Sequence, residues 1–359
     1  MGINQIIIYC VVFFAALGCL DKMIGNKLGL GQAFEEGMMS IGALTMSIVG
    51  IIVLVPVIAD VCRPVIVPVF ELFGADPAMF AGCILANDMG GAPLAQAMAT
   101  DKDAGDFAGL IVGSMLGGTV VFHIPVSLGI VKKEDKEYVA TGILAGVMCV
   151  PIGSFAGGLA AGYSLVMIMT NLIPIVLFAL LIALGLWKFR GVVIKGFTWF
   201  GKLVAAIATF GLGIGLIKSF TGITIVPGTN DISEGFTLAA DCAMLLAGSY
   251  SLVHVITKLC KKPLFKLGKV LGVNEAAVAG MVSTLAISIP VFHMVKDMDK
   301  RGKVVSIAFV VCAASVFGDQ LGFTAGFNPD MVFPMIVGKV VGGVMSVAVA
   351  LWITRMYKE

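Results

Sequence analysis

Four charged side chains of this 359-residue chain lie well inside long apolar runs: Asp88, Asp241, Asp319 and Lys339. If those runs cross a membrane, each such group costs several kcal/mol to keep at depth. A carboxylate in that position can pair with an ammonium group or a metal cation, or can take up a proton. These residues are therefore candidates for a binding or transport site.

Asp88 is the strongest candidate because of its neighbours. It follows Asn87 and precedes Gly90, Gly91 and Pro93 in an otherwise apolar run. Glycine and proline interrupt a helix and leave backbone carbonyls without intrahelical partners. A broken helix that combines helix ends, bare carbonyls and a carboxylate is the arrangement by which transporters hold small polar solutes and ions. The alternative is that Asp88 caps a helix end near the surface.

A second polar pair, Asp319 and Gln320, stands between Phe317 and Phe323. The alternative interpretation is that Asp319 and Gln320 lie at the outer end of a helix, in contact with water. Four further groups are candidates for proton or ion coupling: Asp241, His123, Lys339 and Ser288. The alternatives for these groups are structural, and include a partner of a helix dipole, a buried core histidine and a fixed ion pair.

Together, the candidate binding residues favour a small cation that also carries a hydroxyl or an amine. A carboxylate pairs with the ammonium, and Asn87 or Gln320 binds the polar tail. An aromatic ring such as Phe122 or Phe317 faces the cation. The same groups suit a sodium ion nearly as well, so the residues alone indicate a small cationic or polar solute.

The composition shows what must position these residues. Hydrophobic residues make up 59% of the chain and charged residues only 13%, against about 25% in soluble proteins. So few charges cannot cover a soluble surface, which excludes a soluble enzyme. The net charge of +2 is too small to indicate a nucleic-acid partner. The eight cysteines show no metal-type spacing, and we expect no metal and no cofactor. The chain is predicted to be an all-α polytopic membrane protein embedded in a lipid bilayer.

Eleven apolar runs are candidates to enter the bilayer: 3–20, 38–59, 78–98, 107–131, 139–160, 164–186, 203–217, 237–257, 276–295, 304–324 and 331–354. Two of them are interrupted by polar, glycine or proline residues, 78–98 at Asn87–Pro93 and 276–295 near Ser288–Pro290. Irregular backbone at membrane depth is tolerated only where it is buried in protein or lines a cavity. These two runs are therefore predicted to be broken or re-entrant helices.

An internal repeat places the two interrupted runs in register. Residues 36–102 laid over 234–300, an offset of 198, give fifteen identities in 67 positions, where about six are expected by chance in so biased a composition. The repeat predicts two homologous halves, with repeat one over 1–160, a linking helix within 161–198, and repeat two over 199–359.

The basic residues indicate how the halves are oriented. With eleven crossings, the two membrane sides carry 13 and 10 Lys and Arg, which favours neither orientation. With both interrupted runs re-entrant, nine crossings remain and the split becomes 20 to 3. Because basic loops stay in the cytoplasm, this reading places the N-terminus outside and the C-terminus inside, and makes the repeats inverted. Eleven transmembrane helices remain the alternative.

The runs Leu85–Met98 and Phe317–Phe323, in a chain of this length and layout, resemble the bacterial ethanolamine permeases of the ethanolamine utilisation pathway, the EutH family. The resemblance covers the whole chain. It implies a multi-pass protein of the bacterial cytoplasmic (inner) membrane that takes up ethanolamine, and leaves room for a homo-oligomer. Ethanolamine is a two-carbon ammonium with one hydroxyl, which fits the solute class that the candidate residues favour.

The leading hypothesis is therefore a transporter that binds ethanolamine between the two interrupted runs and alternates access to the two sides. The first alternative is a sodium- or proton-coupled carrier of another small polar or cationic metabolite. The second is an intramembrane enzyme, against which the chain shows neither an HExxH nor a GxSxG motif. We expect a transporter and not an enzyme.

Overall fold

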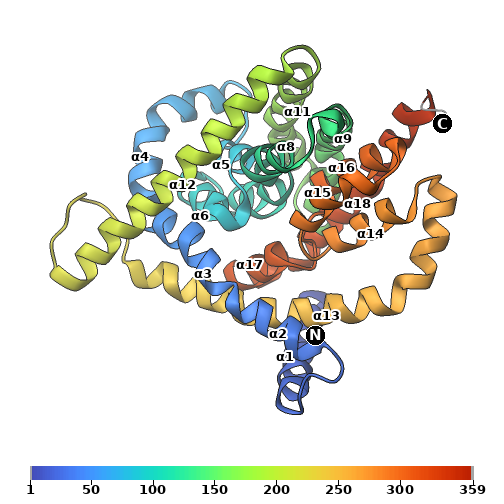
Figure 1. The fold of residues 1–359 in the computed structure, drawn as a ribbon. Helices are drawn as coiled ribbons and strands as arrows, with labels where there is room; N and C mark the ends of the chain where they lie inside the picture. The colour runs from blue at the N-terminus through green and yellow to red at the C-terminus, as the bar shows by residue number, and fades with distance from the viewer. Residues whose placement is uncertain (1, 357–359) are drawn as a thin grey trace.

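The computed structural model describes residues 2–356, apart from the side chains of residues 260–267, 269 and 356. The described residues form helices and no strand (Figure 1), which confirms the predicted all-α class. Eight helical segments are long and apolar enough to cross a bilayer, as expected of a multi-pass membrane protein: Ile3–Met23, Leu30–Glu71, Lys102–Ile130, Lys133–Ala160, Leu165–Lys188, Arg190–Thr221, Ile232–Leu259 and Pro329–Ile353.

The helices follow one another with short connections. Residues 3–160 form α1 (Ile3–Met23), α2 (Leu30–Met39), α3 (Ile41–Leu44), η1 (Thr45–Val49), α4 (Gly50–Glu71), α5 (Ala78–Ile84), η2 (Asn87–Met89), α6 (Gly91–Met98), α7 (Lys102–Asp106), η3 (Phe107–Gly117), η4 (Thr119–His123), α8 (Ile124–Ile130), η5 (Lys133–Asp135), α9 (Lys136–Val147) and α10 (Val150–Ala160). Here η1, η3 and η4 are π-helical, and the other η segments are 3₁₀-helical.

Residues 165–356 form α11 (Leu165–Lys188), α12 (Arg190–Thr221), α13 (Ile232–Leu271), α14 (Glu275–Thr284), α15 (Ile289–Met294), η6 (Val295–Asp297), α16 (Lys300–Ala313), α17 (Asp319–Phe327), η7 (Pro329–Met331), α18 (Val332–Ile353) and η8 (Thr354–Met356). Figure 1 shows α13 as a long helix along one side of the bundle, with α1 and α2 packed against it. Several helices, including α12 and α13, extend beyond the apolar runs that predicted them, because a helix can continue into water.

The first interrupted run, 78–98, is a broken hairpin. Helices α5 and α6 have seven and eight residues, about 10–12 Å each at 1.5 Å per residue, so neither crosses a core of roughly 30 Å. Between them the chain turns at Gly90, whose φ of 86° is the left-handed conformation that glycine adopts without strain. The two ends of the hairpin meet, because the Asp76 carboxylate accepts hydrogen bonds from the backbone N–H groups of Thr100 (3.0 Å) and Asp101 (3.1 Å).

The second interrupted run, 276–295, has the same form. Helix α14 ends at Thr284 and α15 begins at Ile289. At its base, the Asn274 N–H donates to Asp299 Oδ1 (2.8 Å), and the Asn274 side chain donates to the carbonyl of Asp297 (2.9 Å). Both runs are therefore broken helices, as predicted, and the two ends of each run lie close together. We call them hairpin 1 (78–98) and hairpin 2 (275–297).

The expected continuous span 304–324 is a correction. Helix α16 has only 14 residues, and the chain breaks between Ala313 and Asp319, where Ser315 has a φ of 55°. The backbone groups released by this break bind hairpin 2: the Ser315 N–H donates to the Thr284 carbonyl (2.7 Å), and the Phe317 N–H to the Leu285 carbonyl (2.9 Å). The break is tolerated because another broken segment supplies its partners.

Helix bounds and turns recur at the offset of 198. Helix α1 ends at Met23 and α12 ends at Thr221. Gly74 and Gly272, which precede the two hairpins, have φ angles of 65° and 64°. Asp101 and Asp299, which follow them, both cap the next helix. The helix α11 has no counterpart and occupies the predicted linking position. The division into two repeats stays a prediction that these coincidences favour.

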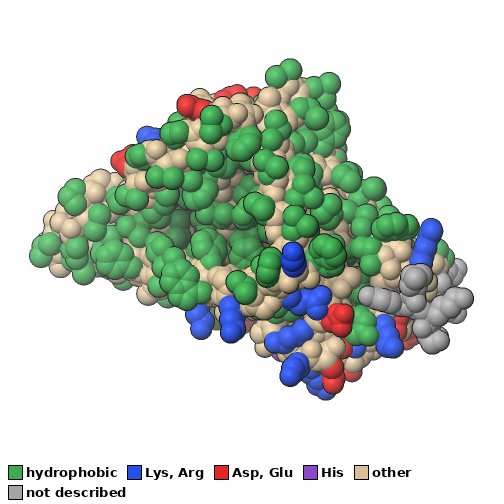
Figure 2. Space-filling model, turned by 90° about the horizontal axis from the view of Figure 1, so that it is seen from above, with side chains coloured by type: hydrophobic (Ala, Val, Ile, Leu, Met, Phe, Trp, Pro, Cys, Tyr) green, Lys and Arg blue, Asp and Glu red, His purple; other side chains and the backbone are tan. Residues whose placement is uncertain are grey.

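Contacts between loops sort the chain into two ends. At one end, Asn4 binds the Asp330 carbonyl (2.7 Å) and Asn328 binds Asp106 (3.0 Å). At the other end, Lys303 pairs with Asp135. The bases of hairpins 1 and 2 thus lie near opposite ends of the segment Lys102–Ile130, as opposed halves require, although the inverted repeat itself stays a prediction. Figure 2 shows a wide hydrophobic area with most of the visible Lys and Arg gathered along one edge.

Candidate functional site

A cavity of about 330 Å³ lies where the broken segments meet. Its walls come from α2–η1, the turn of hairpin 1, η4, α13, the turn of hairpin 2 and the start of α17, so each half of the chain contributes three elements. The lining residues are Ser40, Ala43, Leu44, Ser47, Ala86, Asp88, Met89, Gly118, Phe122, His123, Leu246, Tyr250, Ile287, Ser288, Ile289, Ser315, Asp319 and Gln320.

Asp88 and Asp319 both face this cavity. Asp88 lies in the 3₁₀ turn of hairpin 1, and Asp319 is the first residue of α17. Both are half-buried, and neither forms an ion pair with another described residue. The Asp319 carboxylate accepts a local hydrogen bond from the Gln320 N–H (3.0 Å). Two carboxylates without an ion pair in a half-buried cavity are candidates to bind a cation.

Gln320 and Lys339 form a second layer behind the carboxylates. The Lys339 side chain, on α18, is fully buried. Its ammonium donates to the carbonyl of Ser114 (2.7 Å) and to Oε1 of Gln320. With Oε1 engaged, the amide nitrogen of Gln320 lies beside Gly118, in the cavity wall. It is thus placed to donate a hydrogen bond into the cavity.

His123, Phe122 and Ser288 also reach the cavity wall. The His123 ring packs edge-on against Phe122 and Phe292, with ring centroids 5.8 Å and 6.4 Å away, and its Nδ1 lies 3.4 Å from the Thr119 hydroxyl. An aromatic ring in the wall of a cavity can interact with a bound cation. Ser288 is buried at the start of α15.

Four of the predicted residues do not line the cavity: Lys339, which lies behind its wall, and Asn87, Phe317 and Asp241. Asn87 is fully buried beside Asp88, and its side-chain nitrogen lies 3.4 Å from the Thr324 hydroxyl, so it joins the turn of hairpin 1 to α17. Its Oδ1 has no partner among the described residues. Phe317 packs into a separate apolar cluster, and Asp241 lies against Gly326. Phe317 and Asp319 are two positions apart, a spacing at which side chains on a helix do not face each other.

The cavity also contains polar residues that the sequence did not single out: Ser40, Ser47, Tyr250 and Ser315. Ser40 and Ser47 are seven positions apart, close to two helical turns, so they share a face. That spacing was the only signal for them. Their hydroxyls, with the phenol of Tyr250, add hydrogen-bonding groups to the wall that holds Asp88, Asp319 and Gln320.

A larger cavity of about 710 Å³ adjoins the first, since Ile287 lines both. We call it the vestibule. Lys27, His254 and Lys258 lie in its wall with apolar residues of α13 and α14. The vestibule thus lies next to the site, on the side that holds the 22–29 turn and α14.

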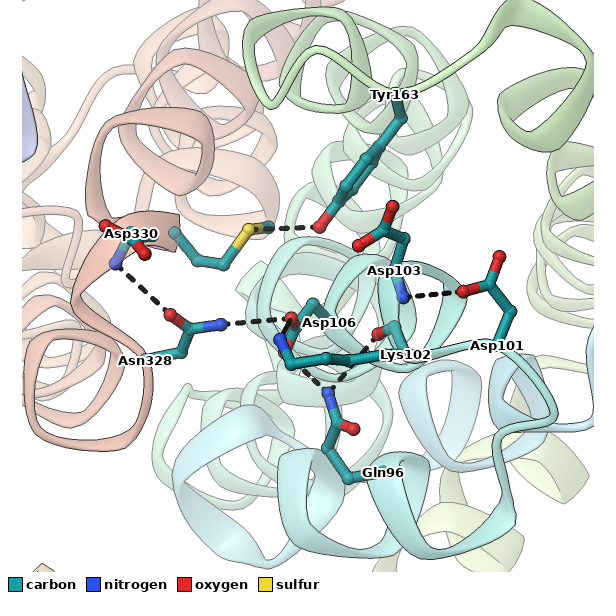
Figure 3. A network of polar contacts seen from close by, with 9 residues as sticks. Gln96, Asp101, Lys102, Asp103, Asp106, Tyr163, Asn328 and Asp330 are labelled. Atoms are coloured by element: carbon teal, nitrogen blue, oxygen red, sulfur yellow. Dashed lines mark hydrogen bonds and ion pairs between the residues drawn. The ribbon is translucent and has the colours of Figure 1, made fainter.

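At the opposite end lies a network of polar contacts around Asp106 (Figure 3). The buried Asp106 carboxylate accepts hydrogen bonds from Gln96 (2.5 Å) and Asn328 (3.0 Å) and pairs with Lys102 (2.7 Å). These residues come from α6, the turn after α17, and α7. Nearby, the Tyr163 hydroxyl contacts the sulfur of Met331 (3.2 Å). The network ties hairpin 1 to the segment that carries Asp319.

The chain is similar to known proteins over its whole length. A family model described as "Ethanolamine utilisation protein, EutH" matches residues 3–353. The chain is 58% identical over 360 residues to a probable ethanolamine permease EutH of Listeria monocytogenes, covering 100% of this chain and 96% of that protein. It is 42% identical over 389 residues to a probable ethanolamine permease EutH of Escherichia coli K12, covering 98% and 95%. It is 43% identical over 354 residues to the uncharacterized protein YxeR of Bacillus subtilis, covering 99% and 96%. No solved structure matches the chain.

Proposed function

Because the chain belongs to the EutH family of ethanolamine utilisation proteins, we propose that it carries ethanolamine across the bacterial cytoplasmic membrane into the cell. The observation that supports this most is the pair of carboxylates, Asp88 and Asp319, which face a cavity without a cationic partner among the described residues. A protonated amine supplies the missing charge.

The rest of the cavity suits the rest of the molecule. Ethanolamine has a hydroxyl two carbons from its nitrogen, and the Gln320 amide and the Tyr250 phenol offer partners for that oxygen. Phe122 offers an aromatic face to the ammonium. A volume of about 330 Å³ holds a solute of this size together with some of its hydration water.

The mechanism we propose is alternating access between two ends. In this conformation the site adjoins the vestibule, and the Asp106 network closes the other end. Hairpins 1 and 2 present their turns to the same cavity from bases near opposite ends of the bundle, so movement of one turn opens one end. Broken helices that meet at a central site support this kind of transport in other carriers.

The orientation follows from the basic residues. We place the end with Lys27, Lys258 and the Lys303–Asp135 pair in the cytoplasm, and the Asp106 network outside. The N-terminus, whose Asn4 binds Asp330, then lies outside and the C-terminus inside. The conformation described here is in this reading open toward the cytoplasm.

Uptake of labelled ethanolamine tests the proposal. The measurement compares a bacterial strain that lacks the protein with the same strain expressing it, at acidic pH, where neutral ethanolamine that crosses lipid unaided is scarce. Uptake should depend on the protein, and the recovered label should be unmodified ethanolamine, since a changed product would indicate an enzyme. Uptake equal in the two strains would contradict the proposal.

Purified protein in liposomes separates facilitated from coupled transport. A sodium gradient or a proton gradient is imposed across the vesicle membrane, and uptake is compared with that of vesicles without a gradient. Accumulation driven by one gradient assigns that ion as the coupled partner, and equilibration without accumulation assigns facilitated diffusion. Stronger inhibition of uptake by another small amine than by unlabelled ethanolamine would favour a carrier of a different metabolite.

A further inference from the structure

We propose that Lys339 determines the charge of the solute that the cavity accepts. The cavity holds two carboxylates, and the buried ammonium of Lys339 offsets one of them. The site is then left one charge short of neutrality, which matches a monovalent cation and rejects a divalent one. This inference rests on the proposed transport of ethanolamine and adds to it a residue that selects by charge.

Lys339 is the only charged residue of α18, and its side chain is completely buried in the protein. Burying an ammonium in an apolar bundle is costly unless nearby groups compensate its charge. Neither of its two hydrogen-bond acceptors, the Ser114 carbonyl and the Gln320 amide, carries a charge. Asp319 directly precedes Gln320 in the chain, so its carboxylate lies close to this contact, and Asp88 faces the same cavity.

The manner of compensation leaves the carboxylates available. Lys339 forms no ion pair with another described residue, because Gln320 occupies its ammonium and stands between it and the cavity. A lysine bound directly to Asp319 would occupy the position that a substrate ammonium needs. Because Gln320 separates Lys339 from the cavity, Lys339 acts on a bound solute only through its electric field. That field is weakly screened in a medium of low dielectric constant.

No described lysine or arginine lines the cavity itself, since Lys339 lies behind Gln320. His123 is the remaining ionisable group with a basic side chain in its wall, and that ring is packed between two phenylalanines. The charge balance of the site therefore depends on three residues: Asp88, Asp319 and Lys339. Changing one of them shifts the net charge by one unit in a known direction, which gives a series of variants with a predicted order.

The test measures uptake of ethanolamine and of 1,2-diaminoethane, a doubly charged ammonium at acidic pH, by purified protein in liposomes. The readout is the ratio of diamine to ethanolamine uptake, which does not depend on the amount of active protein. Lys339→Gln leaves two uncompensated carboxylates, so this ratio should rise at least tenfold. Asp319→Asn leaves a site without net charge, so the ratio should fall below that of the unaltered protein.

Two controls separate charge from packing. Lys339→Arg keeps the charge, and the double variant Lys339→Gln/Asp319→Asn restores the original balance, so both should return the ratio to near that of the unaltered protein. Where Lys339→Gln does not reach the membrane, the Asp319→Asn variant and the double variant still test the order.

A ratio that stays unchanged in Lys339→Gln, or that the double variant fails to restore, would overturn the inference while leaving ethanolamine transport intact. Absence of ethanolamine uptake by the unaltered protein would instead overturn the proposed function and this inference with it.

Discussion

The carboxylate of Asp76 accepts hydrogen bonds from both the backbone N–H (3.0 Å) and the hydroxyl (2.5 Å) of Thr100, 24 residues further along the chain. The same carboxylate caps α5 through the Ala78 N–H (2.8 Å), and the Asp76 N–H donates to Asn171 of the linking helix α11 (2.7 Å). Hairpin 1 is thus fixed at its base, while its turn lines the cavity. Movement of the hairpin during transport is therefore expected at the turn and not at the base.

Replacing Asp76 should weaken this base. Asp76→Asn removes the negative charge from an acceptor of several hydrogen bonds, each worth about 1.5–3 kcal/mol when the acceptor is charged. We expect a clear fall in the Tm of the purified protein in detergent, measured by thermal unfolding. Asp60→Asn, at an exposed carboxylate of α4, is the matched control and should leave the Tm unchanged. An equal Tm for both variants would show that the hairpin is held elsewhere.

Replacing Asp88 should abolish uptake without affecting expression. Asp88→Asn keeps the shape of the side chain and removes the charge that pairs with the substrate ammonium. Because truncating one partner of a buried charge pair costs about 2–5 kcal/mol, uptake of labelled ethanolamine at acidic pH should fall at least tenfold. The amount of variant in the membrane is compared by immunoblot. Wild-type uptake by this variant would remove Asp88 from the site.

Filling the cavity should block it. A Cβ on Gly118 lies 3.3 Å from the amide nitrogen of Gln320, so Gly118→Leu projects its side chain into the space that the solute occupies. Uptake should fall to background while the protein still reaches the membrane. Gly213→Leu is the control, since a Cβ on Gly213 of α12 meets nothing within 4 Å. Blocked uptake in both variants would indicate a general effect of leucine on folding.

Breaking the Asp106 network should open the outer end. In a protein with the exposed Cys10 and Cys19 replaced by serine, Ser47→Cys places a thiol in the cavity wall. An impermeant maleimide added outside should label it several-fold faster when Asp106→Ala is also present, because Gln96, Lys102 and Asn328 then lose their shared partner. Asp103→Ala, at an exposed neighbouring carboxylate, is the control. Equal labelling with and without Asp106 would place the closed gate elsewhere.

Single cysteines in loops test the orientation. In the same background, Glu71→Cys and Asp103→Cys, near the two ends of hairpin 1, should both react with an impermeant reagent added outside. Lys296→Cys and Lys133→Cys should react only after the cells are opened. Opposite accessibility of Glu71→Cys and Asp103→Cys would mean that 78–98 crosses the membrane, and would restore eleven crossings.

The sequence predicted the two hairpins because their breaks contain residues that interrupt helices. Asn87 to Pro93 and Ser288 to Pro290 combine polar groups, glycine or proline within apolar runs. The break after Ala313 escaped prediction because Ala314–Gly318 contains no proline and reads as a continuous apolar helix. What ends α16 there is tertiary: the carbonyls of Thr284 and Leu285 accept the bonds that a helix would otherwise make.

The candidate site was predictable only in part for a related reason. Charged and amide side chains such as Asp88, Asp319 and Gln320 stand out in an apolar sequence because their burial is costly. Hydroxyl-bearing side chains do not stand out in the same way. Ser40 and Ser47 can form hydrogen bonds within their own helix, and Tyr250 can pack against its neighbours, at little cost. Phe317 stands close to Asp319 in the sequence, but side chains two positions apart do not share a helix face.

The lysines of the vestibule disfavour the return of a cation that has left the site on their side. Lys27 and Lys258 lie in the vestibule wall, and their potential reaches roughly 8–10 Å at physiological salt. The positive potential of these lysines repels a cation that has left the site. The same potential lowers the local concentration of cations, so recapture is slowed. Raising the ionic strength on that side removes this bias, so that a molecule delivered to the cytoplasm revisits the mouth more often before it diffuses away.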